Sequence, residues 1–291
     1  MPRPWLVLLA LAALGRSAAA EINMADSVEW MTADADAVVV GTIASSTVTP
    51  SDDHTVWAVA TIDVTATLKG AAAKRVTFAV QTDASGVPAG WLGHEAVFFL
   101  VKSDRRAHDS GCVRACHYDR AAWALRRGVD DGVVTLDAKA GEEVYTAAFT
   151  ALRARADVVA AVKAAASSKA TRAINVDVPW DSDASHALYA GSAVWMYIPI
   201  DAAAEARAVA WIADASVNLR VQGVRVLAER RSAATIRRLK ALLADPGFAT
   251  VTESGKPTIR RYLVRQAADA ALTAWKVAHA APTIDEPLLT P

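Results

Sequence analysis

The chain has 291 residues, of which 53% are hydrophobic and 21% are charged, and its 31 Lys and Arg balance 31 Asp and Glu. This apolar content excludes a disordered tail, and 14 Gly and 11 Pro are too few for a collagen-like or low-complexity chain. A neutral chain has no overall field to hold a polyanion, so we expect no nucleic-acid partner.

The first twenty residues are typical of a signal peptide. Arg3 supplies the positive charge, an apolar run follows over 5–14, and three alanines end the segment at Ala20. The apolar run is shorter than the roughly 20 residues that span a bilayer. We therefore expect cleavage near Ala20, an exported protein that is periplasmic or secreted, and no transmembrane segment in the mature chain. An uncleaved membrane anchor is the alternative.

Residues 21–150 carry the periodicity of strands. Residues 55–68 alternate between apolar and polar positions, as a half-buried strand does, whereas 95–102 are apolar on both faces and should be central. Five or six short strands with turn signals between them predict a small barrel or sandwich. The predicted strands are 37–43, 55–68, 75–81, 95–102, 122–126 and 133–136.

Near Ala147 the period changes to that of helices, and no later strand is expected. A first helix is predicted at 149–166, and the polar stretch 167–182 is interpreted as a linker or long loop. Three further helices each follow a residue that favours a helix N-terminus, and a last one ends the helical part. These capping residues and helices are Asp201 before 202–213, Ser216 before 217–230, Ser232 before 233–244, and finally 258–278.

Two of these helices share a motif, 45 residues apart, in which an Arg precedes a small residue and an apolar residue. The chain here resembles HEAT repeats, which implies that the small residue lets helices approach closely and that the Arg bonds an acid or carbonyl at the adjoining turn. Two unrelated amphipathic helices are the alternative. The motif residues are Arg220, Gly223 and Leu227 in one copy, and Arg265, Ala268 and Leu272 in the other.

The segments 36–42, 76–78 and 93–100 resemble the OB-like barrel of netrin and metalloproteinase-inhibitor proteins. Taken whole, the chain resembles a group of exported bacterial proteins with such a barrel before HEAT-like helices. In the inhibitors an N-terminal cysteine reaches the zinc of a protease, but the mature end expected here begins at Glu21, with no cysteine nearby. The resemblance therefore implies a scaffold without the inhibitory residues.

The expected fold class is α+β, with a small N-terminal OB-like β-barrel followed by a short α-helical HEAT-like repeat domain. The expected organisation is a signal peptide, the barrel, a helix with a linker, the repeat domain and a C-terminal tail. These parts cover 1–20, 21–150, 151–182, 183–281 and 282–291.

Cys112 and Cys116, the only cysteines, lie between His108 and His117. A local disulfide is the first hypothesis, because oxidising compartments favour one. A metal site of both thiolates and both histidines has suitable ligand types for zinc but no familiar spacing. Covalent haem attachment would need two residues between the cysteines, and three are present. Free thiols are the last alternative.

No catalytic motif is found in the sequence. His94-Glu95 lacks the second histidine of a zinc protease, and the segment from Asp181 departs from a calcium loop at its sixth and twelfth positions. There is no nucleophile elbow, phosphate loop or dinucleotide fingerprint. We therefore expect no enzymatic activity and no cofactor.

Arginines gather in the helical part and could form a basic surface, or could be solvated and paired within the repeats. The expected function is a non-catalytic exported binding or scaffold module for protein–protein interaction in the cell envelope. A protease inhibitor built on the barrel, or a hydrolase without a recognisable motif, is the alternative. The partner would be another protein or an envelope component. The candidate surface comprises Arg230, Arg231, Arg237, Arg238, Arg260 and Arg261.

Overall fold

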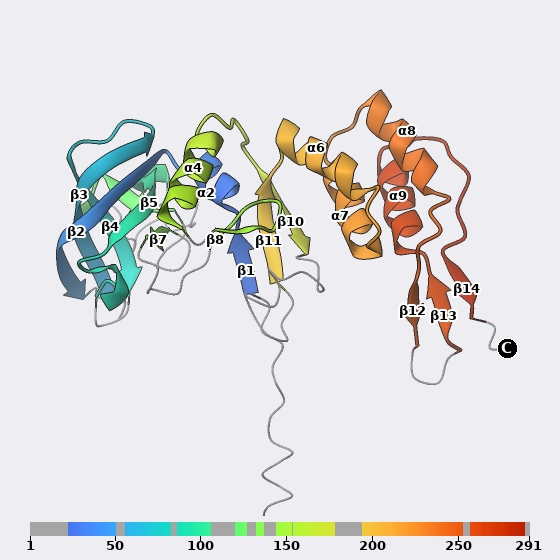
Figure 1. Ribbon diagram of the computed structural model, residues 1–291, viewed down its shortest axis with the longest axis horizontal. Coiled ribbons are helices and arrows are strands. Elements are labelled where there is room, and N and C mark those ends of the chain that lie inside the picture. The colour runs from blue at the N-terminus through green and yellow to red at the C-terminus, as the bar shows by residue number, and fades with distance from the viewer. Residues whose placement is uncertain are drawn as a thin grey trace, which may run out of the picture.

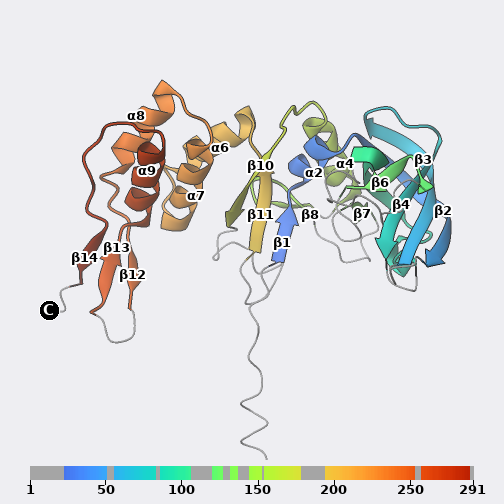
Figure 2. The same ribbon diagram turned by 180° about the vertical axis from the view of Figure 1, so that it is seen from behind.

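The computed structural model describes residues 23–50, 56–82, 86–105, 120–126, 132–136, 144–152, 154–177, 194–252 and 257–288. In this part of the chain the protein is mixed α+β, as predicted. A β-barrel, a three-stranded sheet and a group of helices follow one another in a row, and a second small sheet lies below the last helices (Figure 1). The view from behind shows the same succession (Figure 2).

Five strands close into the barrel. Their order is β2-β3-β4-β6-β5, and pairing of β5 with β2 completes the ring. Neighbours are antiparallel, except that β4 and β6 are parallel. β7 (Val133–Thr135) pairs with β5 next to β6. The ring strands are β2 (Ala37–Pro50), β3 (Val56–Lys69), β4 (Arg75–Thr82), β5 (Glu95–Lys102) and β6 (Trp123–Leu125).

The barrel core follows from the alternation of side chains along its strands. Ile62 of β3 is fully buried inside, where Phe78 of β4 and Phe98 of β5 meet with ring centroids 5.9 Å apart. Phe99, the next residue of β5, faces the opposite way and is also fully buried. The strand predicted at 95–102 is therefore confirmed with the same bounds, and it is apolar on both faces because both are covered.

Two helices supply that second cover, α2 (Val28–Asp34) and α4 (Arg155–Ala165). Val28 of α2 and Val162 of α4 are fully buried in one cluster with Phe99. Ser27 begins α2, because its hydroxyl oxygen accepts the N–H of Trp30 at 3.2 Å. The helices thus join the barrel to the rest of the chain.

The middle sheet has the order β1-β11-β10, with β1 (Asn23–Asp26) parallel to β11 (Val194–Pro199) and β10 (Ala173–Asp177) antiparallel to it. A short hairpin of β8 (Val144–Tyr145) and β9 (Ala151–Leu152) turns at Phe149, whose φ is 64° and whose ring stacks on Trp211 at 5.5 Å. A 3₁₀ turn, η1, covers Ala89–Trp91. The first strand after the expected cleavage site is therefore paired outside the barrel.

Three helices begin where their capping residues predict. Asp201, Ser216 and Ser232 each accept a backbone N–H from the first turn of their helix. A fourth helix packs against the second and third. The helices are α6 (Ala202–Trp211), α7 (Val217–Ala228), α8 (Ala233–Leu242) and α9 (Leu263–Ala274).

The expectation that no strand follows residue 147 is wrong. Part of the predicted linker forms β10, and the predicted helix at 149–166 begins only at Arg155, after β9. The predicted helix at 258–278 begins instead with a strand, β13, and becomes α9 at Leu263. β13 (Ile259–Arg261) lies between β12 (Ala249–Val251) and β14 (Asp285–Pro287) in the second small sheet. β12, β13 and β14 have only three residues each, too few for a clear alternation of apolar and polar positions.

Candidate functional site

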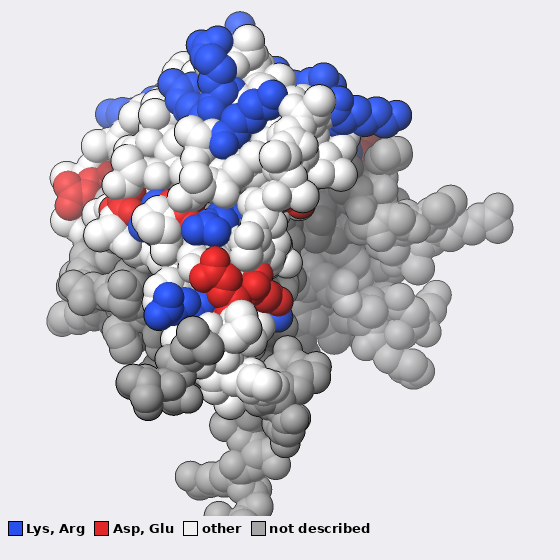
Figure 3. Space-filling model, turned by 90° about the vertical axis from the view of Figure 1, so that its right-hand side faces the viewer, with Lys and Arg blue, Asp and Glu red and all other residues white. Residues whose placement is uncertain are grey.

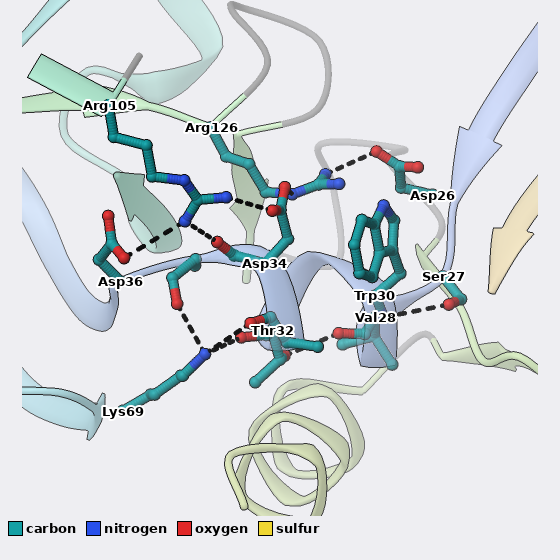
Figure 4. A network of polar contacts seen from close by, with 12 residues as sticks. Asp26, Ser27, Val28, Trp30, Thr32, Asp34, Asp36, Lys69, Arg105 and Arg126 are labelled. Atoms are coloured by element: carbon teal, nitrogen blue, oxygen red, sulfur yellow. Dashed lines mark hydrogen bonds and ion pairs between the residues drawn. The ribbon is translucent and has the colours of Figure 1, made fainter. Parts of the chain in front are cut away.

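A network of charged groups lies where α2 meets the barrel (Figure 4). We call it the polar junction; it comprises Asp26, Asp34, Asp36, Lys69, Arg105 and Arg126. These residues come from the end of β1, from the end of α2 and the residues after it, and from the ends of β3, β5 and β6. The chain topology, rather than any local motif, brings them together.

Arg126 is the buried centre of the junction, with a side chain 1% exposed. Its Nη1 donates to Asp26 Oδ2 at 2.6 Å, and its Nε donates to Asp34 Oδ2 at 2.6 Å. The guanidinium also lies over the ring of Trp30, 5.4 Å from the centroid. One buried cation thus joins two acids on either side of α2.

Arg105 lies on the more exposed side of the junction. Its Nη1 donates to the main-chain carbonyl of Asp34 at 2.6 Å and to Asp36 Oδ1 at 3.2 Å, while Nη2 donates to Asp34 Oδ1. Asp36 Oδ2 accepts the backbone N–H of Lys102 at 2.9 Å. Asp34 is therefore held by two arginines.

Lys69, from the end of β3, contacts the C-terminus of α2. Its Nζ donates to the carbonyls of Thr32, Ala33 and Ala35 at 2.7, 2.8 and 2.6 Å. These carbonyls have no partner within the helix, so an ammonium group there satisfies them and complements the helix dipole. Burial lowers the pKa of Lys69, opposed by Asp36 and Asp34. Lys69 thus acts as a cap supplied by the barrel.

The junction is suited to holding the fold together rather than to proton transfer. Each of its carboxylates accepts a hydrogen bond from a guanidinium group or a backbone N–H group. Glu29, on the neighbouring turn of α2, has a pKa raised by burial, but it accepts the N–H of Ala147 at 2.7 Å. None of these residues was singled out from the sequence.

The two motif arginines meet at Asp245, in the turn after α8. Arg220 donates to Asp245 Oδ1 at 3.0 Å and to the carbonyls of Asp214 and Ala215 at 2.7 and 2.9 Å. Arg265 donates to the main-chain carbonyl of Asp245 at 2.7 Å. These are the kinds of contact that the HEAT resemblance implies for an Arg at the adjoining turn.

The small and apolar motif residues lie in the core between the helices. Gly223 is so close to α6 that an added Cβ would lie 2.9 Å from the carbonyl oxygen of Ala208. Ala268, Leu227 and Leu272 are fully buried in the same cluster. Gly223 therefore permits a close helix approach, while the repeat interpretation itself stays a prediction.

The candidate basic surface separates into paired and unpaired arginines. Arg230 binds Glu205 at 2.6 Å, Arg261 binds Asp285 at 2.9 Å, and Arg260 lies over the ring of Phe248 at 4.9 Å from its centroid. For Arg231, Arg237 and Arg238, no acidic partner is found within the described part of the chain. Among the six candidates, these three keep the character expected of a binding surface within the described residues.

Lys240 also lies on α8 without an acidic partner among the described residues. We call Arg231, Arg237, Arg238 and Lys240 the basic face. In the space-filling view, Lys and Arg gather at the top of the molecule, at the end that carries α8, whereas Asp and Glu lie mostly lower (Figure 3).

Cys112, Cys116, His108 and His117 lie outside the described residues, so the disulfide and metal hypotheses stay predictions. Within the described ranges, no three His, Cys, Asp or Glu side chains are grouped as a metal site. In those ranges, too, no helix has both the length and the apolar character needed to span a membrane.

Comparison of the chain with protein-family models, with curated proteins and with solved structures found no match.

Proposed function

We propose that this chain is a non-catalytic binding or scaffold module, exported to the cell envelope, that acts by contacting another protein. The observation that carries the proposal is the basic face of α8, whose four cations have no acidic partner among the described residues. Charges that a fold does not pair internally are available to a partner.

The architecture supports the same proposal. A closed five-stranded barrel fits the OB-like interpretation, and helices that approach closely at Gly223 fit the HEAT-like one. Both kinds of scaffold present surfaces to other molecules. The polar junction, with its carboxylates occupied by arginines and backbone N–H groups, gives no support to a hydrolase.

The first described residues give no support to the inhibitor alternative. An inhibitor that enters a protease through its N-terminus needs that end to be free. Here Asn23–Asp26 form β1, which is paired with β11, and Asp26 is buried against Arg126. A binding module requires no such free end.

The test is capture from a cell-envelope fraction with two charge variants of equal net change. One variant carries Arg237→Glu, Arg238→Glu and Lys240→Glu; its control carries Lys74→Glu, Lys163→Glu and Lys169→Glu, at exposed positions elsewhere. Crosslinking and quantitative mass spectrometry should recover the same specific protein with the wild type and the control. Recovery of no protein above an unrelated bait would contradict the proposed function.

A further inference from the structure

Two cations of the basic face, Arg237 and Lys240, lie on the side of α8 that is exposed. Thr235 and Leu239 are fully buried. Arg237 and Lys240 are exposed, and Arg238 is half-buried beside them. Arg231 is exposed just before the capping residue Ser232. Since a helix rises about 1.5 Å per residue, Arg237 and Lys240 are about 4.5 Å apart along the axis of α8, and Arg231 adds a fourth cation before the start of the helix.

Three acids of neighbouring elements each have a partner of their own among the described residues. Glu205 binds Arg230 and Glu229 binds Arg172, at 2.6 and 3.1 Å. Asp269 binds His279 at 2.8 Å. α8 itself contains no Asp or Glu. No described acid forms an ion pair with the four cations of the basic face, so their positive charge is available to a partner.

The residue types on the basic face indicate the chemistry of a partner that would neutralise its positive charge. Three of the four cations are arginines, whose planar fork can bind a carboxylate through two parallel hydrogen bonds. Exposed alanines lie among them, at Ala233 and Ala241 on α8 and at Ala244 just after it. Small methyl groups between the cations let a polypeptide backbone approach closely and add apolar contact, which a densely charged polymer cannot use.

We propose that the basic face binds an acidic segment of a partner protein, one that presents several carboxylates with small apolar residues between them. This inference rests on the proposed function and names the chemistry of its partner.

The experiment measures binding of a fluorescein-labelled, acetylated 12-residue peptide of repeating Glu-Glu-Ala by fluorescence anisotropy, with the full mature chain. Inorganic polyphosphate of equal charge serves as the competing anion. Substitution by Glu at Arg237, Arg238 and Lys240 should weaken peptide binding by at least about tenfold, because three attractive charges become repulsive. The control with Lys74, Lys163 and Lys169 changed to Glu should stay within about twofold of the wild type.

Three outcomes would overturn the inference. The first is equal weakening of peptide binding by both variants, which indicates a general charge effect, and the second is no binding of the peptide at low salt. The third is displacement of the labelled peptide by polyphosphate at a much lower concentration than unlabelled peptide requires. A protein captured from the envelope equally well by all three forms would also overturn it while leaving the proposed function standing. A circular-dichroism melt of each variant shows whether the fold is retained.

Discussion

Arg126 and Asp26, a hundred residues apart, form an ion pair that is almost completely removed from water: Nη1 and Oδ2 are 2.6 Å apart, and the side chains are 1% and 0% exposed. Such a pair adds little net stability over well-packed apolar residues, because both charges lose their hydration. Removing one partner leaves the other charge buried and uncompensated. The pair therefore fixes the position of β1 against the barrel.

Arg126→Met should destabilise the protein by about 3–5 kcal/mol, because the buried charge of Asp26 loses the arginine that it binds and Asp34 loses one of its two arginines. Urea unfolding followed by tryptophan fluorescence measures the loss. The control is Arg75→Met, which breaks an exposed pair with Asp63, with side chains 69% and 55% exposed, and should leave the midpoint unchanged. Equal effects of the two substitutions would contradict the role given to Arg126.

Lys69→Met should destabilise the protein by about 1–3 kcal/mol, because three carbonyls at the end of α2 lose their donor. Hydrogen exchange should then be faster at the backbone amides of α2 than elsewhere in the protein. The matched control is Lys74→Met, at an exposed position just before β4. Unchanged exchange in α2 would show that Lys69 does not hold the helix.

Gly223→Ala should destabilise the protein by about 1–3 kcal/mol, although Ala is the better helix former. The added Cβ would lie 2.8 Å from Ile212 Cγ2 and 2.9 Å from the carbonyl oxygen of Ala208, so α6 and α7 would have to separate. The control is Gly90→Ala, where no atom lies within 4 Å of the new Cβ. The measurement is the melting temperature of each variant. A higher melting temperature for Gly223→Ala than for the wild type would show that α6 and α7 are not closely packed at this position.

His279 should make stability depend on pH. Its Nδ1 lies 2.7 Å from the carbonyl oxygen of Val277 and its Nε2 lies 2.8 Å from Asp269 Oδ1, and two acceptors favour the doubly protonated ring. The pKa of His279 is raised by the bond to Val277 and then by Asp269, with Lys240 of α8 opposing. The stabilisation is therefore complete below the unfolded value of about 6.5 and is lost as pH rises through the higher folded pKa.

The measurement is the difference in melting temperature between the wild type and His279→Gln, from pH 5.5 to pH 8.5. The wild type should be the more stable at the acid end, and the difference should shrink towards the alkaline end. An Asp269→Asn variant should show the same trend, since it removes the carboxylate that the protonated ring binds. A difference that grows with pH would have the wrong sign for this pair.

Local features of the sequence predicted local structure well. The helix starts at Asp201, Ser216 and Ser232 could be predicted, because a helix N-terminus depends on its capping residue and the few residues that follow it. The bounds of β5 could be predicted, because a strand that is covered on both faces has a continuous run of apolar residues.

What the sequence did not reveal depends on distant pairing. β10 and β11 are short and pair with each other, and β11 also pairs with β1, far away in the sequence. The residues next to each strand therefore give no sign of its partner. α2 has only seven residues, too few for a clear helical period. Arg126 was not singled out, because an arginine inside a short closing strand resembles a solvated residue until Asp26 and Asp34 are placed beside it.

The parallel pairing of β1 with β11 has a consequence for the order in which the protein forms. A ribosome delivers Asn23 long before Val194, its partner in the register, so the first strand to be made must wait for one of the later ones. The barrel strands β2 to β6 can pair among themselves in the meantime. β1 is therefore one of the last strands of the described chain to acquire its native neighbour.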